Sequence, residues 1–137
     1  RVFYIDEKGK EHLTQFAPEG WFAADHESMY YRKASSYYIQ ALEDTTVYQL
    51  NDDFFEQLSL KDAAFSQMNQ KLLHNHIHHL QKRIIQLIAF TAEERYKEFT
   101  RIYPDTLMRV PQTMVASYLG ITPESLSRIR KDISQKK

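Results

Sequence analysis

The pattern of apolar and polar positions changes from a strand-like to a helix-like period close to residue 50. Before that point, aromatic and β-branched residues gather in four short runs: RVFYI, HLTQF, YYIQAL and TTVYQL. Such runs are typical of strands. Gly9 suits a hairpin turn between the first two runs, and Glu43 with Asp44 suits a turn between the last two. Residues 17–36 resemble a loop, so the pattern predicts part of an antiparallel sandwich or barrel.

From residue 51 onward the apolar residues follow a helical period. Asn51 is placed to cap a short helix over DDFFEQL, and residues 62–90 have the pattern of one long helix. On the long helix, apolar residues recur at alternating steps of four and three, the spacing that buries a stripe against a partner helix. They are Leu73, Ile77, Leu80, Ile84 and Leu87. The stripe predicts a homodimer interface, and packing within a single domain is the alternative.

Two further helices are expected after the long one. Thr91 and Glu94 have the spacing of a capping box, so a helix should begin there and end near Tyr103, ahead of Pro104. Pro111 suits the first turn of the next helix, because its fixed φ angle is helical and its missing N–H is not needed there.

The segment TMVASYLGITPESLSRIRK, residues 113–131, meets the requirements of a helix-turn-helix. Two helices that cross closely need a small residue inside the first helix and a glycine at the sharp turn, which Ala116 and Gly120 supply. Thr122 can cap the second helix, and Pro123 suits its first position. The apolar contacts would come from Val115, Leu119, Ile121, Leu126 and Ile129. The segment predicts a DNA-binding helix-turn-helix, with a plain helical hairpin as the alternative.

The outward side chains of the second helix are candidate DNA contacts. The N-terminal part of a recognition helix meets base edges in the major groove. Glu124 can accept a hydrogen bond from cytosine N4, and Arg128, four residues later, can pair with guanine O6 and N7. The candidates for contacts to phosphates are Ser125, Ser127, Arg130 and Lys131. An intrahelical salt bridge between Glu124 and Arg128 is the alternative, and it is compatible with base reading.

Charge is distributed unevenly, although the formal net charge is zero. Residues 1–60 carry five basic and eleven acidic side chains, a net of −6, whereas residues 106–137 carry six and two, a net of +4. A basic end suits a phosphate backbone, and a solvated tail is the alternative. Together with the apolar pattern, this divides the chain into a β part at 1–60, a dimerisation helix at 61–90 and a helix-turn-helix domain at 91–137. The predicted fold class is α+β.

The order of a β-rich part, a long helix with an apolar stripe and the motif PQTMVASYLGITPESLSRIRK resembles the CRP/FNR family of bacterial transcription regulators. The resemblance covers essentially the whole chain. It implies a cyclic-nucleotide-binding-like jelly roll without its first strands, a dimerisation helix, and a reader in which Glu124 and Arg128 contact bases. It also implies double-stranded DNA, a second copy of the chain and RNA polymerase as partners, in the cytoplasm. Because the chain begins inside a strand-like run, we expect a further piece before Arg1.

The chain departs from the family pattern at the effector site. Family members that bind cyclic AMP carry a Gly-Glu pair and an Arg-Ser pair around the cyclic phosphate. The matching positions here are Ala24 with Asp25 and Ser35 with Ser36, so the main cationic partner of the phosphate is missing. Cyclic AMP is therefore not expected, and an unidentified small-molecule effector is left open. The chain also ends soon after the recognition helix, so fewer phosphate contacts per subunit are expected than in relatives with a β-hairpin wing.

Other chemistry is weakly represented. No nucleophile elbow, phosphate loop or metal-ligand spacing occurs, and the chain has no cysteine, so no enzyme, cofactor or metal site is predicted. His74 and His78 share a helix face, but we expect the histidines of HNHIHHL to flank the dimer helix. No apolar run is long enough for a membrane span. The rival function is a ligand-sensing or protein-interaction module that dimerises without recognising specific DNA.

Overall fold

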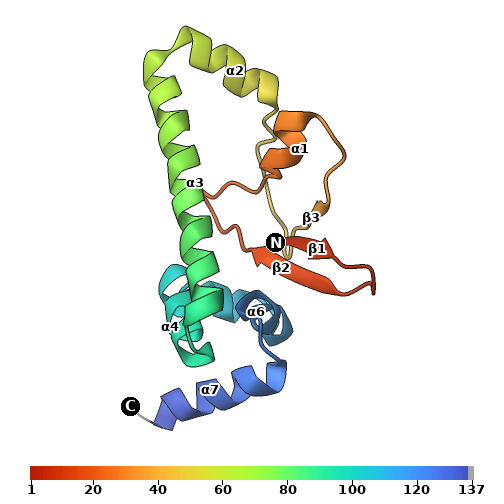
Figure 1. The fold of residues 1–137 in the computed structure, drawn as a ribbon, viewed down its shortest axis with the longest axis vertical. Helices are drawn as coiled ribbons and strands as arrows, with labels where there is room; N and C mark the ends of the chain where they lie inside the picture. The colour runs from red at the N-terminus through yellow and green to blue at the C-terminus, as the bar shows by residue number, and fades with distance from the viewer. Residues whose placement is uncertain (136–137) are drawn as a thin grey trace.

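The computed structural model describes residues 1–135 and shows an α+β chain in which helices accompany one small antiparallel sheet (Figure 1). Its elements in chain order are β1 (Val2–Ile5), β2 (Glu11–Gln15), α1 (His26–Tyr31), β3 (Tyr37–Ile39), α2 (Asp52–Lys61), α3 (Ala63–Ala89), α4 (Ala92–Ile102), α5 (Thr106–Arg109), α6 (Gln112–Leu119) and α7 (Pro123–Gln135). The long α3 forms one side of the molecule, with α2 at one end of it and α7 beyond the other.

The sheet has the strand order β2-β1-β3, and both pairings are antiparallel. The predicted hairpin between β1 and β2 is confirmed. Gly9 takes the positive φ of +77° that the turn requires, and the Asp6 carboxylate accepts the backbone N–H groups of Lys8 and Lys10, each at 2.9 Å.

Two expectations about residues 17–50 were wrong. TTVYQL, residues 45–50, is irregular instead of a strand, and Val47 and Tyr48 are 74% and 94% exposed. A β-forming run becomes a strand only where a neighbour takes its hydrogen bonds, and this run does not pair with any of the three strands in the sheet. Within the expected loop, residues 26–31 form α1, because the Asp25 carboxylate caps it by accepting the N–H groups of Glu27 and Ser28.

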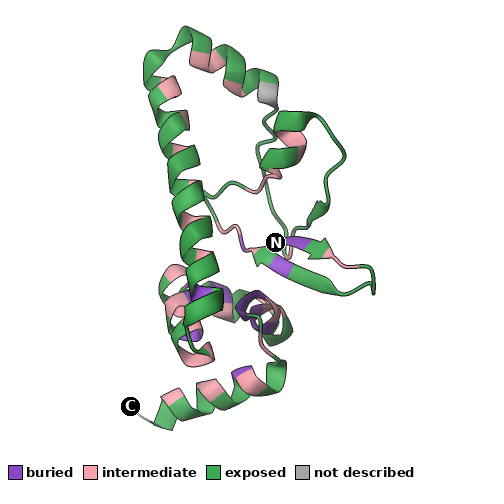
Figure 2. Cartoon of the chain, in the orientation of Figure 1, coloured by how far each residue is buried: buried purple, intermediate pink, exposed green. Residues whose placement is uncertain are grey.

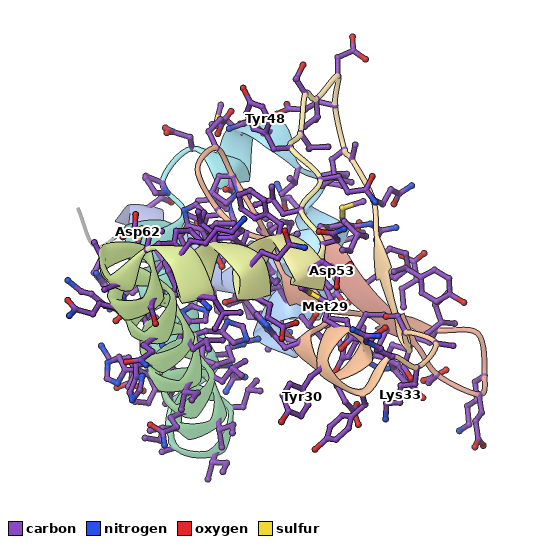
Figure 3. The ribbon with its side chains drawn as sticks, turned by 90° about the horizontal axis from the view of Figure 1, so that it is seen from above. Met29, Tyr30, Lys33, Tyr48, Asp53 and Asp62 are labelled. Atoms are coloured by element: carbon purple, nitrogen blue, oxygen red, sulfur yellow. The ribbon has the colours of Figure 1, made fainter. Side chains whose placement is uncertain are left out.

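The helices after residue 50 follow the predicted pattern closely. Asn51 caps α2, and α3 extends from its own cap, Asp62, to Ala89; Figure 3 shows Asp62 at the corner where α2 meets α3. The capping box is confirmed, since Thr91 accepts from the Glu94 N–H and the Glu94 carboxylate accepts from the Thr91 N–H. Pro111 lies one position earlier than predicted, at the cap of α6. The short α5 was not predicted.

One hydrophobic core joins the hairpin to the C-terminal helices. Phe16, just after β2, packs edge-to-face against Phe99 of α4 and Tyr103, with ring centroids 5.9 Å apart in both pairs. Leu13 of β2 is buried, and its N–H donates to the Ser117 hydroxyl of α6 at 3.2 Å. Figure 2 shows the buried residues concentrated where the hairpin and the C-terminal helices meet. The core therefore draws its residues from the predicted parts 1–60 and 91–137.

Ion pairs also join the N-terminal part of the chain to Arg109, the last residue of α5. The Arg109 guanidinium donates to both carboxylate oxygens of Glu19, at 3.0 and 2.8 Å, and it also pairs with Glu43. The hydrogen bonds from Arg109 hold the pKa of Glu19 down to about 2. The Glu19 side chain is 76% exposed, so solvent screens this pair.

Glu19 should make stability depend on acidity. Its folded pKa is depressed from 4.5, so its contribution is present above about pH 4.5 and is lost as the pH falls towards 2. We expect Glu19→Gln to lower the thermal midpoint modestly at pH 7, with the difference from wild type disappearing near pH 2. Thermal melts over this pH range measure it, with exposed Glu7→Gln as the control. A difference that is independent of pH would contradict the assignment.

Candidate nucleic-acid interface

A tight turn joins α6 to α7. Gly120 adopts a left-handed conformation, with φ +67° and ψ +37°. The Ile121 N–H donates to the Ala116 carbonyl at 3.0 Å and the Gly120 N–H to the Ser117 carbonyl at 3.1 Å, which closes the end of α6. The Thr122 hydroxyl then accepts the Ser125 N–H at 3.2 Å and caps α7. The predicted roles of Gly120 and Thr122 are confirmed.

The apolar residues of this segment fix how the two helices cross. Val115, Leu119 and Leu126 are 0% exposed, and Ala116 is 1% exposed. Ile121 and Ile129 are partly buried against the same core. Both α6 and α7 contact α4, so the second helix is held against a scaffold of two other helices. The five predicted apolar contacts and the small residue at position 116 therefore lie in the packed interior, as expected.

The outer face of α7 carries the candidate contact residues. Glu124, Ser127, Arg128 and Lys131 are exposed and lie on the side opposite Leu126 by helical periodicity. The other two candidates flank that face, with exposed Arg130 on one side and half-buried Ser125 on the other. In Figure 1, α7 lies at the end of the molecule, beyond α4 and α6.

The charged side chains on the outer face of α7 are not paired with each other. Glu124 and Arg128 form no ion pair in the described part of the chain, so the alternative interpretation of this pair as a salt bridge does not hold here. Hydrogen bonds from its own backbone N–H and from the Thr122 hydroxyl lower the pKa of Glu124. A shallow hollow of about 150 Å³ beside Arg128 is lined also by Ser125 and Asp132. The face thus presents a carboxylate acceptor and a free guanidinium one turn apart.

Two arginines that the sequence did not reveal hold the end of α6. Arg83 of α3 stacks its guanidinium 4.0 Å above the centre of the Tyr118 ring and donates to the Tyr118 carbonyl. Arg95 of α4 donates to the carbonyls of Leu119, at 3.0 Å, and Phe90, at 2.7 Å. The last carbonyls of a helix lack partners within it and carry partial negative charge, so cations suit them. No local sequence signal identifies such contacts.

The predicted stripe on α3 is exposed in the single chain. The exposed fractions of Leu73, Ile77, Leu80, Ile84 and Leu87 range from 43% to 56%. A continuous apolar row along a helix is unfavourable in water and typical of an interface. Its assignment to a homodimer stays a prediction.

The four effector candidates lie around the start of α1. The Ser35 hydroxyl donates to the Asp25 carboxylate at 2.7 Å, and this bond, followed by the cap bonds, keeps the pKa of Asp25 low. Ala24 is half-buried, and Ser36 is exposed. Tyr30 and Lys33 point outward in Figure 3, and Tyr30 is 80% exposed. The Asp25 carboxylate is therefore engaged in local hydrogen bonds, and the effector site stays a prediction.

The histidines of α3 contact the N-terminal part. The His76 and His26 rings are 4.6 Å apart, and the His79 ring is 6.3 Å from Trp21. Burial lowers the pKa values of both His76 and His79.

In the part of the chain that the structure describes, no three His, Cys, Asp or Glu residues are grouped to hold a metal ion. Nor does any described helix combine the length and apolar character needed to cross a bilayer.

Comparisons with known proteins point to regulators. No family model matches the chain. It is similar to the "Anaerobic regulatory protein" of Pasteurella multocida (strain Pm70), with 29% identity over 140 residues that cover 94% of this chain and 50% of that protein. It is equally similar to the "Anaerobic regulatory protein" of Aggregatibacter actinomycetemcomitans, at 29% identity over 94% of this chain and 54% of that protein. The chain thus spans about half the length of these curated relatives.

Proposed function

We propose that this chain is part of a sequence-specific DNA-binding transcription regulator of the CRP/FNR type. The observation that carries the proposal is α7, a helix that follows a glycine turn, buries one face on α4 and α6, and exposes Glu124 and Arg128 on the other. The similarity to two regulatory proteins along 94% of the chain supports it.

In this proposal α7 enters the major groove. Arg128 pairs with guanine O6 and N7, and Glu124 accepts from the N4 amino group of a neighbouring cytosine. The side chains that contact phosphates and set the pose are Ser125, Ser127, Arg130 and Lys131. Arg83 and Arg95 hold the preceding helix through its last carbonyls, so α7 is presented in a fixed direction.

The second half of the proposal concerns assembly and control. Two copies pair through the α3 stripe and present two copies of α7 to a two-fold-symmetric site. The hairpin belongs to a cyclic-nucleotide-binding-like domain that responds to a small molecule other than cyclic AMP, and RNA polymerase is the downstream partner. An effector must bind the DNA-competent pose more tightly than the other pose. The shared core between β2 and α6 offers a physical connection for this coupling.

Selection of bound duplexes from a random pool by the full-length protein tests the proposal. With competitor DNA at near-physiological salt, a two-fold-symmetric site should be enriched, with half-sites about one helical turn apart. Selection should be repeated with a cell extract of small metabolites, because an effector can be required. A pool that stays random under both conditions would refute specific recognition and favour the rival interaction module.

Arg128 and Lys131 should separate base reading from phosphate binding. Arg128→Ala is expected to cost about 1–3 kcal/mol and to relax the preference at one base position. Lys131→Ala, a change at an equally exposed position one turn away, should weaken all sequences alike and reduce the salt dependence. Titrations against the selected site and its single-base variants measure both. Equal effects of the two changes on every sequence would contradict the assignment of Arg128.

A further inference from the structure

A pocket of about 230 Å³ lies between α3 and α4. Its lining includes His79, Lys82, Arg83 and Gln86 of α3, together with Glu98 and Arg101 of α4. By helical periodicity, His79, Lys82 and Gln86 lie away from the apolar stripe, whereas Arg83 flanks it. No residue of α7 lines it. The pocket is therefore separate from the outer face of α7, and it borders the apolar stripe at Arg83.

The pocket carries unbalanced positive charge. Arg101 is neutralised by Glu98, which accepts its Nε–H at 2.8 Å and its Nη2–H at 2.6 Å. Arg83 is half-buried, and its contacts are a carbonyl and an aromatic face instead of a carboxylate. Lys82 has no ion pair or hydrogen bond within the described residues. Lys82, Arg83 and Arg101 thus face a single carboxylate, Glu98, and these four charged lining residues carry a net charge of +2.

The chemistry around these cations favours a negatively charged ligand. Burial lowers the pKa of Arg83, with a smaller contribution in the same direction from nearby Arg95. The same physics lowers the pKa of His79, through burial first and then Arg83. Both effects mean that added positive charge is disfavoured here, and an anion in the pocket would reverse them.

Gln86 adds a polar side chain to the pocket. The residue is 8% exposed, and its backbone carbonyl accepts the Phe90 N–H at the end of α3. Its side-chain amide lines the pocket, and among the described residues it is not one of the buried polar groups that lack a hydrogen-bond partner. The amide therefore faces the space of the pocket and is placed to donate a hydrogen bond to a ligand there.

We propose that the pocket between α3 and α4 binds a small phosphate-bearing anion. Lys82 and Arg83 supply the charge, and the Gln86 amide donates a hydrogen bond. A phosphate group carries roughly −1.5 to −2 charge at neutral pH, which matches the net positive charge of the pocket lining. The volume exceeds that of several water molecules, at about 30 Å³ each, and admits a pyrophosphate or the phosphates of a nucleotide. A free anion is favoured over the DNA backbone because α7 does not reach the pocket.

Binding of the anion in this pocket would affect how α7 is held. The anion would bridge α3 and α4, and it would contact Arg83, the residue that stacks on Tyr118 at the end of α6. Arg83 therefore acts as a positioning residue between the anion and the helix that precedes α7. This site does not depend on DNA recognition, so either assignment can fail while the other stands.

Titration calorimetry of the full-length protein with inorganic pyrophosphate, at constant ionic strength, tests the site. Saturable binding is expected. Lys82→Gln, at an exposed position that folding tolerates, should weaken it about tenfold or more, because a charge-assisted contact is lost. Lys71→Gln is the matched control, since Lys71 is an exposed lysine of α3 outside the pocket, and it should bind like wild type.

Gln86→Glu gives a readout that needs no ligand. The new carboxylate has nearly the same shape and would supply the missing negative charge, so pyrophosphate binding should be lost while the thermal midpoint of the unliganded protein rises. Absence of saturable binding, or equal weakening by Lys71→Gln, would overturn the proposal. So would unchanged pyrophosphate binding in Lys82→Gln accompanied by weaker binding to DNA of any sequence, because the relevant phosphate would then belong to DNA.

Discussion

Leu119→Ala is expected to lower the free energy of unfolding by about 2–5 kcal/mol, far more than a substitution on the molecular surface would. Leu119 is 0% exposed in the core that joins the hairpin to α4, α6 and α7. Removing its buried methyl groups leaves a cavity, and the surrounding rings cannot collapse into it freely. Urea unfolding of the full-length protein, followed by circular dichroism, measures the change.

Leu60→Ala is the matched control for this change. It removes the same atoms from a helix, but Leu60 is 82% exposed, so the expected effect is within about 0.5 kcal/mol. Below its unfolding midpoint, Leu119→Ala should also lose more affinity for the selected DNA site than for random DNA, because α7 is less firmly held. If the two substitutions destabilise equally, the position assigned to α6 in the core is wrong.

The features predicted correctly from the sequence are those encoded within a few residues. Asn51 caps α2 through a bond to an N–H three residues later, and the capping box at Thr91 closes over the same span. Gly120 and Thr122 specify a helix end and the following helix start through equally local bonds. Side chains that satisfy nearby backbone groups have recognisable spacings, so the end of α6 and the start of α7 could be predicted from the sequence.

The features that sequence reasoning missed depend on distant partners. Arg109 and Glu19 are separated by 90 residues, and Arg83 and Tyr118 by 35. Nothing near Arg83 or Arg109 distinguishes these arginines from solvated ones. Strand formation is also non-local, which explains why a β-forming run at residues 45–50 remains irregular when no neighbouring strand pairs with it.

The double substitution Leu80→Lys/Ile84→Lys should convert a dimer into monomers. These stripe residues are 47% and 56% exposed in one chain, and pairing two copies of α3 would bring each side chain close to its counterpart. Four lysines facing one another across the axis would repel and could not be desolvated cheaply. Sedimentation should show the mass of a single chain, while circular dichroism keeps the helical signal, because neither residue belongs to the core.

Loss of the dimer should then appear in DNA binding. Two linked readers bind a symmetric site far more tightly than one, so the affinity should fall roughly 100-fold or more while a single half-site is bound nearly as before. Gln67→Lys/His74→Lys is the control, because it adds the same charges at exposed positions of α3 outside the stripe. A stripe variant that remained dimeric would place the interface elsewhere. A monomer with unchanged affinity for the full site would show instead that the stripe dimerises without aligning the readers, which is the behaviour of the rival interaction module.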